Sequence, residues 1–189
     1  TVLAPFLFTL YTADFYHQSP HCHLQKFSDD SAIVGLIRDG DDRAYRELIE
    51  DFVDWCQLNH LQLNAGKTKE LVVDFRRHKQ PCTQVIIQGT DIEMVTSYKY
   101  LGVHMNNKLD WTDHTAATYK KGQSRLHLLR KLRSFGVQGA LLTSFYDSVV
   151  ASAIFYGVVC WNSSISAADR RRLDKLIKKA SSILGCPLD

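Results

Sequence analysis

Apolar residues recur at helical spacing in two places near the start of the chain. From Tyr45 the apolar positions lie at offsets of three, four, seven, eight and eleven residues, which places them on one face of an amphipathic helix. A shorter helix is predicted after Pro5, because Leu7, Leu10 and Tyr11 follow the same spacing and proline favours the first turn of a helix.

Short apolar runs predict strands. The runs 24–27 and 32–37 flank Ser28-Asp29-Asp30-Ser31, a pattern typical of a β-hairpin with a short acidic turn. Residues 39–42 (Asp-Gly-Asp-Asp) predict a turn whose carboxylates cap the following helix. Further short strands are predicted at 71–75, 85–87, 93–95 and 98–103.

From residue 112 the pattern predicts helices only. They cover about 113–135, 140–161 and a segment from Ser166, where Ser166-Ala-Ala-Asp169 has the capping-box form with Asp in place of Glu or Gln. The run 141–161 is long enough to cross a membrane, but Asp147 would be costly in hydrocarbon, so we interpret it as a core helix and expect no membrane. The fold class is therefore α+β, with an all-helical region beginning near residue 112.

Charge divides the chain at the same point. Residues 1–111 hold 11 Lys and Arg against 15 Asp and Glu, a net charge of −4, whereas residues 112–189 hold 12 against 5, a net charge of +7. The second region is thus a candidate for contact with a polyanion. The solubility of basic helices explains the same charge equally well.

The five cysteines are scattered and odd in number, with no C-x-x-C pair. Together with the absence of a secretory pattern, this predicts an intracellular, reducing compartment, with nucleus and cytoplasm not distinguished. The chain opens at Thr1 within an apolar pattern, so we expect it to be part of something longer.

Two apparent sites carry little weight. His17, His21, Cys22 and His23 have zinc-ligand side chains but no second cluster at zinc-finger spacing, and a polar loop explains them as well. Gly66-Lys67-Thr68 resembles part of a phosphate-binding loop, yet Leu61 stands where that loop needs glycine and the order of strand and helix is reversed.

Asp29 and Asp30 are the strongest candidates for chemistry. Adjacent carboxylates about 4 Å apart repel by about 1 kcal/mol in water and by about 4 kcal/mol at a protein-surface dielectric. Between two apolar strands, which we expect to be buried, a cation such as Mg²⁺ would offset this repulsion. The alternative is an exposed Asp-Asp turn.

Four segments resemble, in family order, blocks of the reverse transcriptases of non-LTR retrotransposons. Phe27-Ser28-Asp29-Asp30 resembles their aromatic-x-Asp-Asp motif, and Leu63-Asn64-Ala-Gly-Lys67-Thr68 their Leu-Asn-x-x-Lys-Thr block. Residues 1–14, which include Pro5, resemble the segment under the templating base. Residues 98–103 (Tyr-Lys-Tyr-Leu-Gly-Val) resemble the hairpin that grips the primer end.

The resemblance implies a partial palm at 1–111, an antiparallel sheet with helices, followed by a thumb-like region at 112–189. It implies RNA-directed DNA polymerisation with Mg²⁺, an RNA template, a DNA primer and no small-molecule cofactor beyond the nucleotide. Asp29 would be a direct metal ligand, Asp30 a weaker or indirect one, and Lys67 a proton donor near the leaving pyrophosphate. The residues implied in primer or nucleic-acid contacts are Pro5, Phe27, Tyr100, Leu101 and Gly102.

The family's other essential aspartate and its fingers precede the segment that Thr1 begins. We therefore expect this chain alone not to polymerise DNA. The alternatives are a non-catalytic nucleic-acid-binding module and an inactive pseudogene product.

The last predicted helix carries a basic arc that spans roughly 120° of its circumference: Arg171, Arg172, Lys175, Lys178 and Lys179. Apolar residues fill the opposite side, so the basic arc either runs along a phosphate backbone or is a solvated face. The segment Arg170 to Leu188 also resembles the amino terminus of AlkB-type alkylated-DNA-repair homologues. The chain lacks the H-x-D motif of that family's iron triad, so no oxygenase activity is expected.

Overall fold

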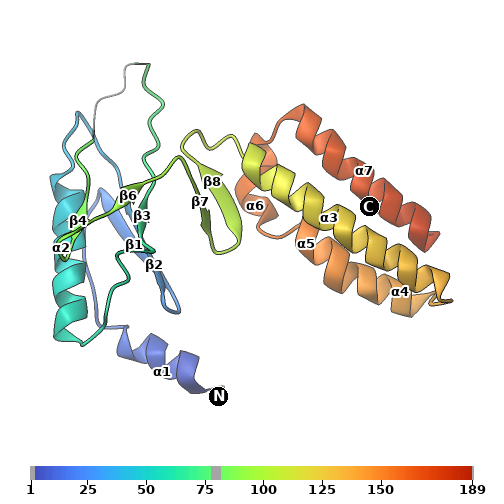
Figure 1. Ribbon diagram of the computed structural model, residues 1–189, viewed down its shortest axis with the longest axis horizontal. Coiled ribbons are helices and arrows are strands. Elements are labelled where there is room, and N and C mark those ends of the chain that lie inside the picture. Colours follow the sequence, from blue (N-terminus) through green and yellow to red (C-terminus); the bar gives the residue numbers. More distant parts are fainter. Residues whose placement is uncertain (1–2, 78–81, 189) are drawn as a thin grey trace. The chain divides into compact units, whose positions relative to one another are not determined.

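The computed structural model describes residues 3–77 and 82–188, which form two units. The first unit runs to Glu70 and resumes from Arg77 to Met94; the second contains Leu71 to Arg76 and the chain from Val95 onward. The mixture of helices and short strands confirms the α+β class (Figure 1). The division into a palm at 1–111 and a thumb-like region at 112–189 stays a prediction, and Thr1 and Val2 of the first block lie outside the described residues.

The first unit contains two helices and six strands in the described residues. They are α1 (Leu3–Tyr11), β1 (Cys22–Phe27), β2 (Asp30–Gly35), α2 (Arg43–Leu58), β3 (Lys69–Glu70), β4 (Ile86–Ile87), β5 (Thr90–Asp91) and β6 (Glu93–Met94). Its core is a small apolar cluster of Ile49 from α2 with Val85, Ile87 and Ile92. The helix predicted after Pro5 is present but begins two residues before it.

Helix α2 confirms the spacing read from the sequence, because its buried residues are Leu48, Ile49, Phe52 and Cys56. The turn before it is also confirmed. The carboxylate of Asp41 accepts a hydrogen bond from the backbone N–H of Arg43 at 3.1 Å and so satisfies one of the free donors at the helix start.

The predicted hairpin is formed by β1 and β2, paired from Cys22↔Gly35 to Phe27↔Asp30 around the two-residue loop Ser28-Asp29. At its open end, Gly35 allows the ring of Tyr45 to lie directly on β2. A Cβ at this position would be 2.7 Å from the Tyr45 Cδ2 atom, so a larger residue would force the helix away.

The strand predicted at 71–75 is absent, because the ladder stops at Glu70. Among the described residues, the strands pair in four two-stranded sheets, three of them antiparallel and one parallel (β3 with β6), so the predicted antiparallel pairing is present in small separate sheets. β3 to β6 have only two residues each, so each offers few backbone N–H and C=O groups for pairing with a second neighbouring strand.

The second unit combines a hairpin with a helical bundle. Its elements are β7 (Ser97–Tyr100), β8 (Val103–Asn106), α3 (Thr112–Ser134), α4 (Ala140–Phe145), the π-helix η1 (Tyr146–Ala151), α5 (Ser152–Ile154), α6 (Val158–Trp161), the 3₁₀-helix η2 (Asn162–Ser164) and α7 (Ala167–Leu184). Residues 98–103, predicted as one strand, instead span the turn of the β7–β8 hairpin, with Leu101 and Gly102 at positive φ.

The predicted helix 140–161 is interrupted. A π-helical stretch occupies its middle, and Gly157, at φ +61°, ends the run before α6. By length and composition Ala140–Ser164 could cross a membrane. In the structure one side of it, including Tyr146, Val150, Ile154 and Trp161, lies in the core of the helical unit, while 22% of its most apolar window is buried.

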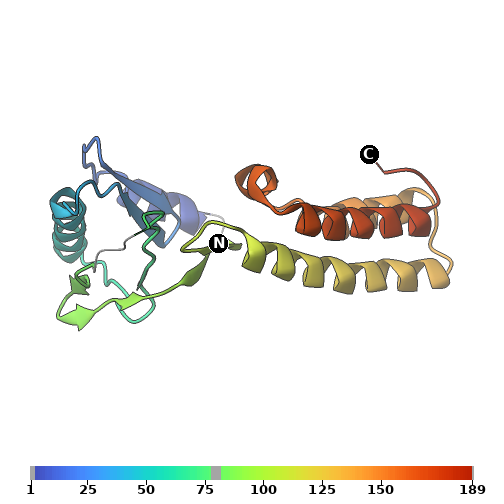
Figure 2. The same ribbon diagram turned by 90° about the horizontal axis from the view of Figure 1, so that it is seen from above.

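Helices α3 and α7 lie side by side in both views (Figures 1 and 2). They run in the same direction, since Arg172 stacks on the ring of Tyr119 near their starts, at 4.6 Å from the centroid. Near their ends, Arg133 donates a hydrogen bond to the carbonyl oxygen of Ser182 at 2.9 Å. The N-cap predicted at Ser166 is confirmed, because the Ser166 hydroxyl oxygen accepts a hydrogen bond from the Asp169 N–H at 3.1 Å. The Asp169 carboxylate accepts a hydrogen bond from the same hydroxyl at 2.7 Å.

Gly122 sets how closely these two helices approach. A Cβ on Gly122 would lie 2.6 Å from the Leu176 Cδ1 atom and 3.3 Å from Ile154 Cγ1. A larger side chain here would therefore separate α3 from both α7 and α5.

We expect Gly122→Val to destabilise the protein by about 1–3 kcal/mol, because extra volume must be forced into a closely packed contact. Chemical denaturation measures this. Ser124→Val, on the exposed side of the same helix, is the matched control and should change stability by less than about 0.5 kcal/mol. Equal losses in the two variants would show that the close approach at Gly122 does not matter.

Candidate functional site

The acidic pair lies at the tip of the β1–β2 hairpin, as predicted, but it is exposed. Asp29 is in the loop and Asp30 is the first residue of β2. Only Cys22 is buried in β1 and no residue is buried in β2, and Phe27 is 60% exposed. The expectation that buried strands flank the pair was wrong.

Strand alternation gives the reason. Successive side chains point to opposite faces of a strand, so Cys22, Leu24 and Lys26 share the face on which α2 packs. Phe27 and its partner Asp30 belong to the other face, whose residues are largely exposed within this unit. The apolar runs in the sequence therefore indicate a hairpin covered on one side only.

The pair has no further ligand-type neighbours in the structure. Among the described residues, no group of three or more His, Cys, Asp or Glu side chains could hold a metal ion. His17, from the set weighed for zinc, lies instead beside Asp51, with its Nδ1 atom 3.2 Å from a carboxylate oxygen.

The Leu-Asn-x-x-Lys-Thr segment forms a turn that presents Lys67. The backbone N–H of Lys67 donates to the Asn64 side-chain oxygen at 3.0 Å, and the Thr68 hydroxyl donates to the Asn64 carbonyl oxygen at 2.9 Å. Lys67 itself is exposed. Asn64 and Thr68 thus have a structural role, while Lys67 remains available to a ligand.

The hairpin predicted to hold a primer end is fixed by a residue far along the chain. The hydroxyl of Tyr156 donates to the carbonyl oxygen of Leu101 at 2.7 Å, and a Cβ on Gly102 would lie 3.1 Å from the Tyr156 ring. Gly102, at φ +85°, therefore provides both the turn and the space for the ring. Sequence reasoning missed Tyr156 because no local pattern links it to this turn.

A cavity of about 350 Å³ lies beside this turn, lined by Gly102, His104, His114, Lys121, Arg125 and Tyr156 among others. His114 is buried, and burial lowers its pKa below the usual 6.5, which favours the uncharged ring. Its Nδ1 atom accepts a hydrogen bond from the backbone N–H of His104 at 3.3 Å. The positive charge of the cavity thus comes from Lys121 and Arg125.

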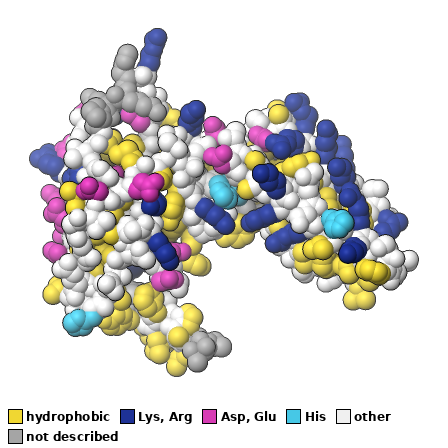
Figure 3. Space-filling model, viewed as in Figure 1, with side chains coloured by type: hydrophobic (Ala, Val, Ile, Leu, Met, Phe, Trp, Pro, Cys, Tyr) yellow, Lys and Arg dark blue, Asp and Glu magenta, His cyan; other side chains and the backbone are white. Residues whose placement is uncertain are grey.

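The basic arc of α7 is exposed in full, while Leu173, Leu176, Ala180 and Ile183 of the same helix are buried. Figure 3 shows Lys and Arg side chains gathered along this helix. Arg172 is partly neutralised by Asp169, at 3.3 Å. The other four members of the basic arc make no ion pair in the part of the chain that the structure describes.

The predicted site residues fall into two groups. Pro5, Phe27, Asp29, Asp30 and Lys67 belong to the first unit. Tyr100, Leu101, Gly102 and the basic arc belong to the second. Within the second unit, the hairpin and the basic arc are both anchored on α3, by the His104–His114 hydrogen bond and by the Arg172–Tyr119 contact.

Comparison with known proteins identifies the relationship. The chain is 26% identical over 99% of its length to an RNA-directed DNA polymerase from the mobile element jockey of Drosophila funebris. It is 24% identical over 99% of its length to a probable RNA-directed DNA polymerase from transposon BS of Drosophila melanogaster. This chain is similar to the RNA-directed DNA polymerases of non-LTR retrotransposons. It spans about a fifth of the length of these relatives, 21% and 22% respectively.

A second likeness is confined to the helical region. The family model for the amino-terminal part of alkylated DNA repair protein alkB homolog 8 matches residues 111–152. The likeness to such proteins predicted from the sequence is confirmed, but its position at 170–188 was wrong, because the match covers α3, α4 and η1 and not α7. No solved structure matches the chain significantly.

Glu70 is a further group that sequence reasoning missed. It is buried, its Oε1 atom accepts a hydrogen bond from the Tyr45 hydroxyl at 3.3 Å, and its Oε2 atom has no hydrogen-bond partner among the described residues. Burial raises the pKa of Glu70 above its ordinary value of 4.5. Glu70 is the last residue of β3, shortly after the Lys67 turn, where the pattern of the sequence gave no sign of burial.

We expect the charged form of Glu70 to destabilise the fold. Because its folded pKa is raised, the stability it contributes is complete below pH 4.5 and is lost as the pH rises through the folded value. Glu70→Gln should therefore be more stable than the parent at pH 7 and nearly equal to it at pH 4. Denaturation curves at both pH values measure this, and a stability difference that does not vary with pH would contradict it.

Proposed function

We propose that this reverse-transcriptase-derived chain binds nucleic acid through the basic surface of its helical unit, without base specificity. The observation that carries the proposal is the exposed basic arc of α7, four of whose five members lack an ion-pair partner in the described structure. Such cations gain affinity by neutralising phosphates and releasing counterions. The likeness to RNA-directed DNA polymerases, enzymes that act on RNA and DNA, supports the same partner.

In this proposal residues 1–111 are a remnant of a polymerase palm and residues 112–189 are thumb-like. Asp29 and Asp30 would bind Mg²⁺, Lys67 would lie near the pyrophosphate, and Tyr100 to Gly102 would hold a primer end. The donors fit the ion, because Mg²⁺ is usually bound by one or two carboxylates together with substrate phosphates and water. When bound, the ion would supply Lewis-acid polarisation of phosphoryl oxygens.

The chain should bind RNA and DNA duplexes of different sequence with similar affinity, and the affinity should fall steeply as salt rises. For B-DNA the slope of log K against log salt is about −0.9 for each phosphate neutralised. Removing two members of the basic arc with Arg171→Gln and Lys178→Gln should reduce the magnitude of this slope by about 1.8. Fluorescence anisotropy at several salt concentrations measures both the affinity and the slope.

The control removes two exposed cations of the first unit, Arg38→Gln and Arg77→Gln, with the same change in net charge. It should leave the slope nearly unchanged. A slope that falls equally in both double variants would assign binding to net charge alone and would refute an interface on α7.

We also expect the purified chain not to extend a primer on an RNA template with Mg²⁺ or Mn²⁺. Two exposed carboxylates at one hairpin tip do not complete a two-metal clamp, which needs ligands for both ions. Template-dependent extension that disappears in Asp29→Asn would contradict this expectation. Extension that persists in Asp29→Asn would point to a contaminating polymerase.

A further inference from the structure

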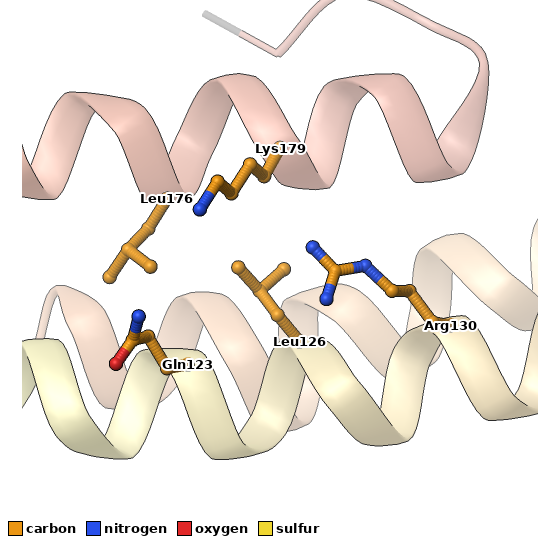
Figure 4. Close-up of a pocket in the computed structure, with 5 residues that line it drawn as sticks. All are labelled: Gln123, Leu126, Arg130, Leu176 and Lys179. Carbon is orange, nitrogen blue, oxygen red and sulfur yellow. The ribbon is translucent and has the colours of Figure 1, made fainter.

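A groove between α3 and α7 brings two unpaired cations together. It has a volume of about 70 Å³ and is lined by Gln123, Leu126, Arg130, Leu176 and Lys179. In Figure 4 the side-chain nitrogens of Arg130, Lys179 and Gln123 point into the space between the two helices, around Leu126 and Leu176. None of the sequence patterns assigned a role to Arg130 or Gln123.

The two charges lack an internal counterion. Neither Arg130 nor Lys179 makes a hydrogen bond or an ion pair within the described parts of the chain. The sequence offers little acid nearby, since Asp147 is the only Asp or Glu between residues 114 and 168. Two cations that face the same small space repel each other, and an anion between them adds an attraction to each cation that outweighs this repulsion.

The surroundings of the groove favour a phosphate. Leu126 and Leu176, at 1% and 0% exposure, form an apolar floor, which strengthens electrostatic attraction above it relative to open water. The guanidinium of Arg130 presents a planar fork suited to two phosphate oxygens, and the ammonium of Lys179 is a point charge for a third. The volume exceeds the roughly 30 Å³ that one water occupies in the liquid, so a group of several atoms has room.

The groove also continues the basic arc. At 100° per residue, Arg172 and Lys179 share the flank of α7 that faces α3, whereas Arg171 and Lys178 lie on the far flank, about 100° away. A nucleic-acid strand on the arc would thus pass the mouth of the groove.

We propose that Arg130, Lys179 and Gln123 form a phosphate clamp, in which a single backbone phosphate of a bound nucleic acid sits between α3 and α7. The inference deepens the proposed function, because it rests on nucleic-acid binding by the helical unit. It adds that α3 and α7 hold one phosphate jointly, so that their close approach at Gly122 is required for binding as well as for packing.

A double-mutant cycle tests the joint contact. Suppose that Arg130 and Lys179 hold one phosphate. The fold-loss of duplex affinity in Arg130→Gln/Lys179→Gln is then smaller than the product of the fold-losses in the two single variants. The slope of log K against log salt falls in magnitude by about 0.9, as for one phosphate. For Arg171→Gln/Lys178→Gln, whose residues are about 10 Å apart along the helix axis, the losses multiply and the slope falls by about 1.8. Multiplicative losses at Arg130 and Lys179, with a slope change of about 1.8, would overturn the clamp while leaving the proposed function intact.

A second measurement needs no nucleic acid. Titration of the whole chain with inorganic phosphate, against acetate at equal ionic strength, should shift the methyl NMR signals of Leu126 and Leu176 saturably. Arg130→Gln should reduce the apparent affinity at least several-fold. If these signals saturate with phosphate but the chain binds no duplex, the groove is a phosphate site and the proposed function fails. Equal shifts with acetate and phosphate, or shifts that do not saturate, overturn the clamp.

Discussion

The close approach of α3 and α7 at Gly122 is the contact on which the helical unit depends. A hydrogen in place of a side chain lets Leu176 and Ile154 pack against α3, and it aligns the buried face of α7 with that of its neighbour. Once Leu173, Leu176, Ala180 and Ile183 face inward, the amphipathic spacing of α7 leaves its cations outside. The same packing of α3 against α7 places Lys179 and Arg130 at one groove, so it produces both the apolar core and the basic surface.

Local periodicity was sufficient to predict α2, α3, α7, the acidic hairpin and the N-cap at Ser166, because each depends on residues a few positions apart. Features that depend on distant residues were not predictable in this way. Tyr156 fixes the turn at Leu101 from 55 residues away, and Glu70 is buried by contacts with Tyr45. Residues 71–75 have the composition of a strand but no ladder continues past Glu70, and a strand requires a partner that its own sequence does not specify.

For the acidic pair, the predicted hairpin was correct but the predicted burial of its strands was wrong. The apolar runs around Asp29 and Asp30 identified the hairpin and its tip, but apolar composition alone does not say whether one face or both are covered. Alternation along β1 gives one covered face, which leaves Phe27 and both carboxylates exposed. The likeness to RNA-directed DNA polymerases therefore rests on motif order and overall similarity, whereas the excess of positive charge lies in residues 112–189.

Lysine footprinting of the chain on a nucleic-acid duplex tests most directly whether this helical surface is the interface. Acetylation of the free and the bound chain, read by mass spectrometry, reports which ammonium groups the duplex shields. Shielding concentrated at Lys175, Lys178 and Lys179, with Lys67 of the first unit still reactive, is the result that an α7 interface predicts. Shielding concentrated at Lys67, or spread evenly over all exposed lysines, would contradict it.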